Sequence, residues 1–232
     1  MLPNGIRILT SSFRHTNAVS IIFLFGAGSR YETPELAGAS HLFEHMLFKG
    51  TPERPTPRAI SEVVEGVGGT LNAFTDREVT GYWCRLAQPN YRDGIDLLSD
   101  MTLNSIFREG DIAKEKQVVY EEIRASFDSP AARASMLLDD LLWPDQPMGR
   151  DIAGSVKSVE AISRDEMCKY LETQYVGSNT VIAIAGNIEH QDVVDQITNS
   201  LGSLHDGDIL PMFPHEKKDL PKRVALEHRP TE

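Results

Sequence analysis

The chain has 232 residues, of which 41% are hydrophobic and 25% charged, a composition that argues against a disordered protein and leaves room for one large or two small domains. Lys and Arg total 23 against 34 Asp and Glu, so the formal charge of -11 at pH 7 argues against nucleic acid or an anionic membrane as a partner and favours a cationic peptide. The only two cysteines, Cys84 and Cys168, exclude a disulfide framework and a four-thiolate metal site, and they indicate a reducing compartment.

The N-terminus passes from the turn signal Pro3-Asn4-Gly5 into a strand-like alternation, without the cationic and apolar regions of a signal peptide. No apolar run reaches the ~20 residues that a membrane-spanning helix needs. We therefore expect a cytoplasmic protein with no membrane partner.

Hydrophobic periodicity and turn signals divide the chain into strands and helices. Predicted strands lie at 6–11, 18–25, two paired stretches within 68–87, and 179–188. Predicted helices lie at 34–49, 57–67, 91–107, 111–126, 130–142, 164–175 and 191–201.

Three details complete this division of the chain. Asp111, which follows Gly110, is a candidate N-cap. Residues 202–221 are rich in Gly, Pro, Asp and Lys and are predicted to be a loop, and 224–226 begin a last strand. The order predicts an α+β fold, a mostly antiparallel sheet with helices packed on one face, in a single domain over 1–232.

The stretch HLFEH, residues 41–45, concentrates ionisable side chains on an otherwise apolar helix. At ~100° per residue, His45 falls about 40° and Glu44 about 60° from His41, so all three share one narrow face. Histidines one turn apart can direct two imidazole nitrogens at one metal ion, and Glu44 lies close enough to accept a proton from an activated water. The alternative is three polar residues on a solvated helix face.

A catalytic zinc wants three protein ligands, and the segment around Glu122 offers the third. On a helical wheel Glu122 borders the apolar stripe, Glu121 lies about 100° away on the polar side, and Glu115 is two turns earlier on the face of Glu122. Half-buried carboxylates need compensation, which is either a metal ion or a salt bridge to Arg or Lys. The sequence leaves both open.

Together, HLFEH, the Gly-Thr pair ending at Thr51, GGTLNAFTDRE at 68–78 and EKQVVYEEI at 115–123 resemble the pitrilysin-type zinc peptidases. That group contains the mitochondrial processing peptidases and insulin-degrading enzyme. It has H-x-x-E-H followed 70 to 80 residues later by a glutamate, and here 77 residues separate His45 from Glu122. The resemblance also covers LPNGIRIL, GRDIAGS and NTVIAIAGNI, hence nearly the whole chain, and is nearest to bacterial members similar to the processing peptidases.

The resemblance implies specific roles for the residues of this site. His41, His45 and Glu122 would bind one Zn²⁺ per chain, Glu44 would be the general base, and Glu115 would support the ligands from behind. Extended, unfolded peptides would bind as an added strand along five residues: Gly69, Asn72, Ala73, Phe74 and Thr75. The same stretch could instead be only one arm of a hairpin.

The family usually has two homologous halves that close over the peptide, and the second supplies an Arg-Tyr pair that helps bind the scissile carbonyl. The chain resembles the N-terminal, catalytic half, so we expect a second half in the same or another chain, or a dimer, as its partner. The favoured function is a zinc endopeptidase. The alternatives are a zinc-bearing but inactive peptide-binding or structural subunit, and a zinc hydrolase that acts on other bonds.

Overall fold

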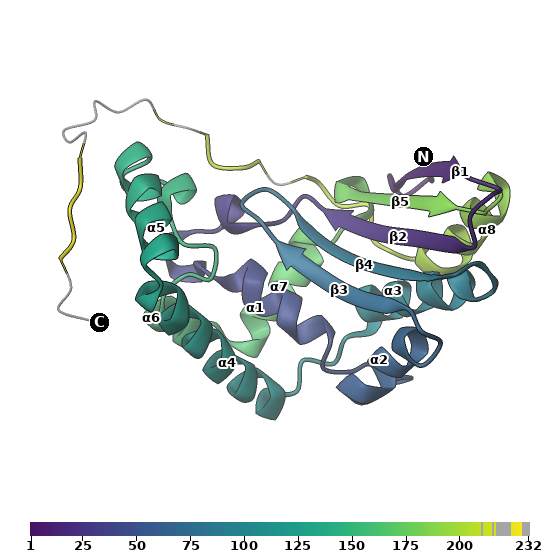
Figure 1. The fold of residues 1–232 in the computed structure, drawn as a ribbon, viewed down its shortest axis with the longest axis horizontal. Helices are drawn as coiled ribbons and strands as arrows, with labels where there is room; N and C mark the ends of the chain where they lie inside the picture. Colours follow the sequence, from purple (N-terminus) through teal and green to yellow (C-terminus); the bar gives the residue numbers. More distant parts are fainter. Residues whose placement is uncertain (210, 215, 217–223, 229–232) are drawn as a thin grey trace.

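The computed structural model describes residues 1–209, 211–214, 216 and 224–228 (Figure 1). Its sheet has the strand order β1-β5-β2-β4-β3, with β1 parallel to β5 and every other neighbouring pair antiparallel. The strands are β1 (Arg7–Ser12), β2 (Ala18–Phe25), β3 (Thr70–Thr75), β4 (Thr80–Ala87) and β5 (Thr180–Gly186). The prediction of a mostly antiparallel sheet is confirmed.

The α-helices lie on one face of the sheet (Figure 1). Within the described residues they are α1 (Ala39–Leu47), α2 (Pro57–Glu65), α3 (Tyr91–Asn104), α4 (Glu109–Asp128), α5 (Pro130–Leu142), α6 (Val156–Ala161), α7 (Arg164–Gln174) and α8 (His190–Leu201). Helix α3 packs against β2 and β4, and α1 lies between β3 on one side and α4 on the other. The predicted α+β fold with helices on one face is therefore what the chain adopts.

The alternation of the central strands explains why only one face is covered. In β2 the side chains of Val19, Ile21, Phe23 and Phe25 are buried against the helices, while Ser20 on the opposite face is exposed. A period of two puts alternate residues on opposite faces, so a strand with this pattern has one face for the core. The main hydrophobic core lies between the sheet and the helices.

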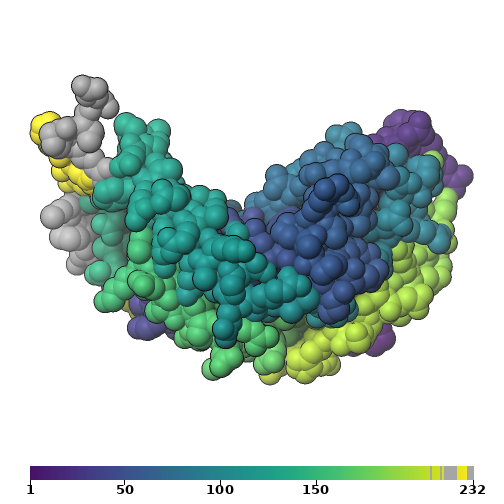
Figure 2. All heavy atoms as spheres, turned by 90° about the horizontal axis from the view of Figure 1, so that it is seen from below, coloured from purple at the N-terminus to yellow at the C-terminus, as the bar shows by residue number. Residues whose placement is uncertain are grey.

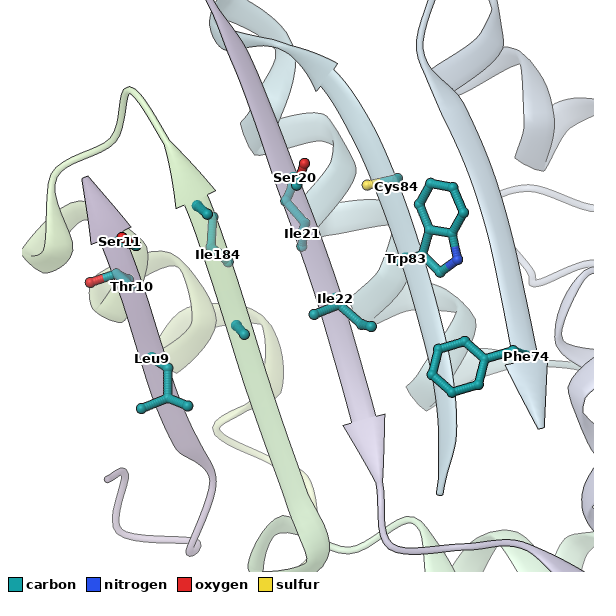
Figure 3. A pocket seen from close by; sticks show the side chains of 12 residues that line it. Leu9, Thr10, Ser11, Ser20, Ile21, Ile22, Phe74, Trp83, Cys84 and Ile184 are labelled. Carbon is teal, nitrogen blue, oxygen red and sulfur yellow. The ribbon is translucent and has the colours of Figure 1, made fainter. Parts of the chain in front are cut away.

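The opposite face of the sheet carries a shallow apolar pocket of about 510 Å³ (Figure 3). Leu9, Ile22, Trp83 and Phe74 line it, from four different strands. Phe74 therefore points away from the helices, although its neighbours in β3 point towards them.

The structure corrects the predicted helix at 34–49, which is two separate elements. A short 3₁₀ turn, η2 (Pro34–Leu36), precedes α1, and Gly38 between them has a φ of 94°. A Cβ at Gly38 would also lie 2.5 Å from the carbonyl oxygen of Ala153. Gly38 is thus the residue that allows the chain to turn into α1 at this crowded point.

Three further predictions differ from the structure. Helix α4 begins two residues earlier than expected, with Arg108 as its N-cap, so Asp111 lies inside the first turn. Helix α6 was not predicted, because its six residues are too short for a periodic signal. Residues 224–228 form no strand, and 202–209 continue without one after α8, while 210, 215 and 217–221 of the predicted loop lie outside the described residues.

Candidate metal centre

Helix α1, which carries the two histidines, is fixed at its N-terminus by a buried carboxylate. Glu32 is 2% exposed, and its oxygens accept hydrogen bonds from the backbone N–H groups of Gly38 (2.9 Å) and Ser40 (2.7 Å). The Ser40 hydroxyl is also 2.6 Å from Glu32 and 2.7 Å from the Tyr170 hydroxyl. These contacts satisfy N–H groups that a helix end leaves unpaired, so the helix is held in one position.

Helix α4 supplies carboxylates along the face that it turns towards α1. Ile112, Glu115 and Val119 are buried, and Glu122 lies one turn beyond Val119 on the same side. Glu121 instead points to solvent, where it pairs with Arg124 at 2.5 Å. The wheel distinguished these two neighbouring glutamates correctly, because the apolar residues decide which face of α4 is buried.

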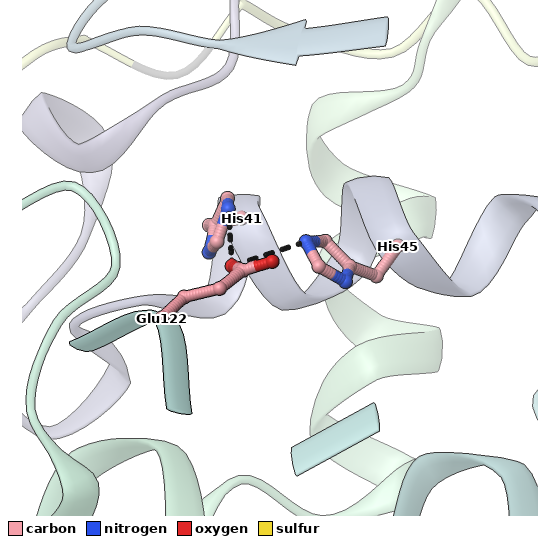
Figure 4. A group of neighbouring side chains, drawn as sticks. All are labelled: His41, His45 and Glu122. Atoms are coloured by element: carbon pink, nitrogen blue, oxygen red, sulfur yellow. Dashed lines mark ion pairs between the residues drawn. The ribbon is translucent and has the colours of Figure 1, made fainter. Parts of the chain in front are cut away.

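The structure brings His41, His45 and Glu122 together (Figure 4). The Nε2 atoms of His41 and His45 lie 3.5 Å and 3.6 Å from Glu122 Oε2. One ligand atom from each residue lies within 4.8 Å of the other two, and among the described residues this is the group of histidine and acidic side chains with such spacing. Two residues four positions apart in α1 and a third from α4, a helix far away in the sequence, thus form one cluster.

The donor set and its spacing fit a zinc ion. Two imidazoles and one carboxylate are the ligands of many catalytic zinc sites, and bond lengths of 2.0–2.1 Å in a tetrahedron put ligand atoms about 3.3 Å apart. The two separations from Glu122, 3.5 Å and 3.6 Å, are close to that value, and all three ligand atoms lie within 4.8 Å of one another. The Glu122 side chain is 45% exposed, so one side of the cluster stays open to a water molecule or substrate.

Burial favours the neutral form of His41 that a metal requires. Loss of hydration in the protein, followed by the neighbouring His45, lowers the pKa of His41 to about 4. At neutral pH the His41 ring therefore keeps a free nitrogen lone pair. Its Nδ1 is buried and has no hydrogen-bond partner in the described part of the chain.

Glu44 lies on the same helix but contacts strand β3. Its Oε2 accepts a hydrogen bond of 2.5 Å from the hydroxyl of Thr75. Burial raises the pKa of Glu44 above its ordinary value, and the hydrogen bond from Thr75 opposes that change. Within the described residues no side chain donates a hydrogen bond to the other carboxylate oxygen of Glu44, and a base needs one such free oxygen to take up a proton.

Glu115 lies behind His45. Its Oε2 is 3.2 Å from His45 Nδ1, and its Oε1 is 2.6 Å from the ammonium of Lys49. The sequence offered a metal ion or a salt bridge as the compensation for the two carboxylates of α4. In the structure Glu115 has the salt bridge, and Glu122 lies with the histidines.

Of the five residues expected to bind substrate, four lie in β3, on its two opposite faces, and one precedes the strand. Ala73 and Thr75 are half-buried on the helix side, whereas Asn72 and Phe74 are exposed. The Asn72 side chain accepts a hydrogen bond of 2.8 Å from the N–H of Ala73. Gly69 precedes the strand, and its N–H donates to the carbonyl of Val64 at 2.9 Å. Lys49, which pairs with Glu115, was not singled out by the sequence, because a lysine just beyond a helix has no distinctive pattern.

Two family models match the chain. Residues 7–156 match the model described as insulinase (peptidase family M16), and this match contains all the residues of the cluster. Residues 161–232 match the model described as the peptidase M16 inactive domain.

Relatives and solved structures agree with this match. A zinc protease of Rickettsia bellii is 36% identical over 207 residues, which are 89% of this chain and 50% of that protein. A probable mitochondrial-processing peptidase subunit beta of Arabidopsis thaliana is 37% identical over 199 residues, 84% of this chain and 37% of that protein. The crystal structure of a protease from Helicobacter pylori has a TM-score of 0.85 at 22% identity, over 93% of this chain and 52% of that one.

The chain spans about half the length of most of the curated relatives that it matches. The described residues contain no helix that is long and apolar enough to cross a membrane. The matched model covers well over half of the chain, and its relatives include proteins named zinc protease and processing peptidase. The chain belongs to the insulinase family of peptidases, peptidase family M16.

Proposed function

We propose that this chain is the catalytic half of a zinc endopeptidase that cleaves extended, unfolded peptides. The observation that carries the proposal is the cluster of His41, His45 and Glu122, with the carboxylate of Glu44 on the same helix face. The names of the relatives, zinc protease and processing peptidase, support the same reaction class. The two cysteines are unpaired, which supports a reducing, cytoplasmic compartment.

Each residue then has one task in the reaction. His41, His45 and Glu122 would hold the ion, and when bound it would supply Lewis-acid activation of a water molecule and of the scissile carbonyl. Glu44 takes the proton of the attacking water on its free carboxylate oxygen and delivers it to the leaving amine. Thr75 holds the other oxygen of Glu44, and Glu115 holds the His45 ring.

The proposed substrate path runs along β3. In the sheet formed by the described residues, β3 is a terminal strand that pairs with β4 alone, so its other edge is available to a peptide in an extended conformation. The space-filling view shows the molecule hollowed between α4 and α5 on one side and the region of α2 and β3 on the other (Figure 2). A peptide added to this edge would pass Thr75 and reach Glu44.

The Asn72 side chain occupies a hydrogen-bonding group on this edge of β3. Its side-chain oxygen accepts the N–H of Ala73, which a substrate carbonyl would otherwise accept. A peptide that adds to β3 would displace the Asn72 side chain and use the Ala73 N–H itself. The hydrogen bond therefore protects the edge strand while no substrate is present.

A comparison of the protein with its Glu44→Gln variant tests the function. Both should bind one zinc ion, because Glu44 is not among the proposed ligands, but only the parent should cleave a quenched mixture of unstructured peptides, and a chelator should stop that cleavage. A general base contributes about 10²- to 10⁴-fold to the rate of a reaction, so the kcat of the variant should fall at least about 100-fold. Substantial hydrolysis by Glu44→Gln, or a parent that binds no zinc, would disprove the proposal.

A further inference from the structure

Lys49 connects the end of α1 to the carboxylate behind His45. It follows the helix by two residues, and its N–H donates to the carbonyl of Met46 at 3.1 Å, which holds its backbone close to the last turn. Its ammonium lies 2.6 Å from Glu115 Oε1, while Glu115 Oε2 lies 3.2 Å from His45 Nδ1. One buried carboxylate thus joins a lysine to a histidine of the cluster.

The contacts from Lys49 to Glu115 and from Glu115 to His45 determine which nitrogen of His45 faces the cluster. A carboxylate accepts hydrogen bonds and cannot donate one, so Nδ1 of His45 carries the proton that Glu115 accepts. Nε2 then keeps its lone pair, and it is the nitrogen that faces Glu122, at 3.6 Å. The other histidine has no such support in the described residues, since His41 Nδ1 lacks a partner.

Glu115 performs this task only if its own charge is compensated. It is 8% exposed, and a buried carboxylate without a cation or donors is costly, so without Lys49 it would rotate away from His45. Lys49 is the cation within reach, with a side chain that is 25% exposed. The ammonium also balances charge, because Glu44, Glu115 and Glu122 bring three negative charges and a divalent ion brings only two positive ones.

We propose that Lys49 is a positioning residue of the metal centre: it fixes Glu115, and Glu115 in turn holds His45 in the orientation and tautomer that bind the ion. The inference rests on the proposed function in one respect, that the cluster binds zinc. Lys49 forms its ion pair with Glu115 and none with the three proposed ligands. Its effect on the metal therefore passes through Glu115.

The test is a double-mutant cycle read by zinc affinity, with zinc alone as the probe and a chromogenic chelator as competitor. The variants are Lys49→Met, Glu115→Gln and the two combined. Contacts that orient a metal-binding histidine are worth about 10- to 100-fold in affinity, so each single variant should bind zinc that much more weakly. The combined variant should bind about as weakly as Glu115→Gln alone, because Lys49 has nothing left to act on.

Three controls separate positioning from a general effect on the fold. Lys114→Met removes a lysine of α4 whose side chain is 79% exposed, and it should leave the zinc Kd unchanged. Lys49→Arg keeps the charge and should restore most of the affinity. Lys49→Gln replaces Lys49→Met if the latter does not fold, and unfolding midpoints of the metal-free proteins show how much of any loss is structural.

The outcomes distinguish this inference from the proposed function. A parent that binds zinc while Lys49→Met binds it equally well would overturn the inference alone, as would losses that multiply in the combined variant. A parent without zinc affinity would overturn both. Absence of peptide cleavage even with the homologous second half present, with the affinities in the predicted order, would support the role of Lys49 and refute only the proposed peptidase activity.

Discussion

Thr75 lies in strand β3, but its hydroxyl is hydrogen-bonded to a side chain of helix α1. The sequence placed it with the substrate-binding residues of the strand, and in the structure its Oγ1 donates to Glu44 Oε2 at 2.5 Å. A carboxylate rotates freely unless one oxygen is held. The contact therefore fixes the orientation of the proposed base and connects it to the strand along which we propose that the peptide binds.

Replacement of Thr75 by Val should lower kcat by roughly 10- to 100-fold, in line with the ~1.5–3 kcal/mol of a hydrogen bond to a charged group. The lost bond stabilises the ionised form of Glu44, so its removal raises the Glu44 pKa further above the ordinary value. The base must be ionised to act, and the acidic limb of the kcat/KM profile should therefore move to higher pH. The measurement is a pH–rate profile of the variant beside the parent protein.

Thr75→Ser is the matched control, since it keeps the hydroxyl and removes only a methyl group. It should retain most of the activity and the pH profile of the parent. The zinc Kd should be the same in all three proteins, because Thr75 touches none of the proposed ligands. A Thr75→Val variant with an unchanged acidic limb would show that the hydroxyl does not hold the base.

Residues that follow from local periodicity were predictable, and residues that depend on helix packing were not. The wheel placed His41, Glu44 and His45 on one face and chose Glu122 over Glu121, because both results depend on the spacing within one helix. The salt bridge of Lys49 to Glu115 and the contact of Thr75 with Glu44 join elements distant in sequence. No pattern within one helix or strand specifies which residues meet across such a packing.

At the scale of elements, the cluster joins two helices that lie side by side. Helix α1 brings His41 and His45, and α4 brings Glu122, which follows His45 by 77 residues. The boundaries of both helices were predicted to within two or three residues at most ends, but α1 starts five residues late because Gly38 turns the chain before it. The packing of α1 against α4 brings the three proposed ligands together from two separate segments of the chain.

Zinc should therefore stabilise the folded protein. Binding to the folded state alone contributes about 2.7 kcal/mol at a free zinc concentration 100 times the Kd. For a chain of this size each kcal/mol corresponds to about 2–4 °C, so Tm should rise by about 5–11 °C and fall back on chelation. Calorimetry with and without zinc measures the shift.

His41→Ala tests whether the shift comes from this cluster. The variant retains one histidine and Glu122, so it should lose most of the zinc-dependent rise in Tm. Glu121→Gln serves as the matched control on α4, since Glu121 faces solvent and pairs with Arg124. An equal rise in the parent and in His41→Ala would place the stabilising ion elsewhere.

At the scale of the whole molecule, the cluster is open on one side. The Glu122 side chain is 45% exposed. The hollow between α4 and α5 on one side and the region of α2 and β3 on the other is open in the view of Figure 2. The relatives named zinc proteases are about twice as long as this chain. The proposed second half would close the hollow over a bound peptide.

We expect the chain alone to bind zinc with full affinity but to cleave peptides slowly. Addition of the homologous second half, as a separate polypeptide or in one chain, should raise kcat/KM at least 10-fold, because enclosure excludes water and adds groups that stabilise the transition state. The zinc Kd should not change, since all proposed ligands lie in this half. Equal kcat/KM values with and without the second half would show that this half is catalytically sufficient.

The separation of the ligands along the chain also has a consequence for the order of events after synthesis. A growing polypeptide exposes His41 and His45 long before Glu122, and two histidines on an unfolded segment hold zinc only weakly. The proposed set of three ligands would be complete only once α4 lies beside α1, whose start Glu32 holds in the folded structure. If the cluster binds zinc as proposed, metal capture would be a late step of maturation, and we expect the newly made chain to be unable to hydrolyse itself or its unfolded neighbours while it is still folding.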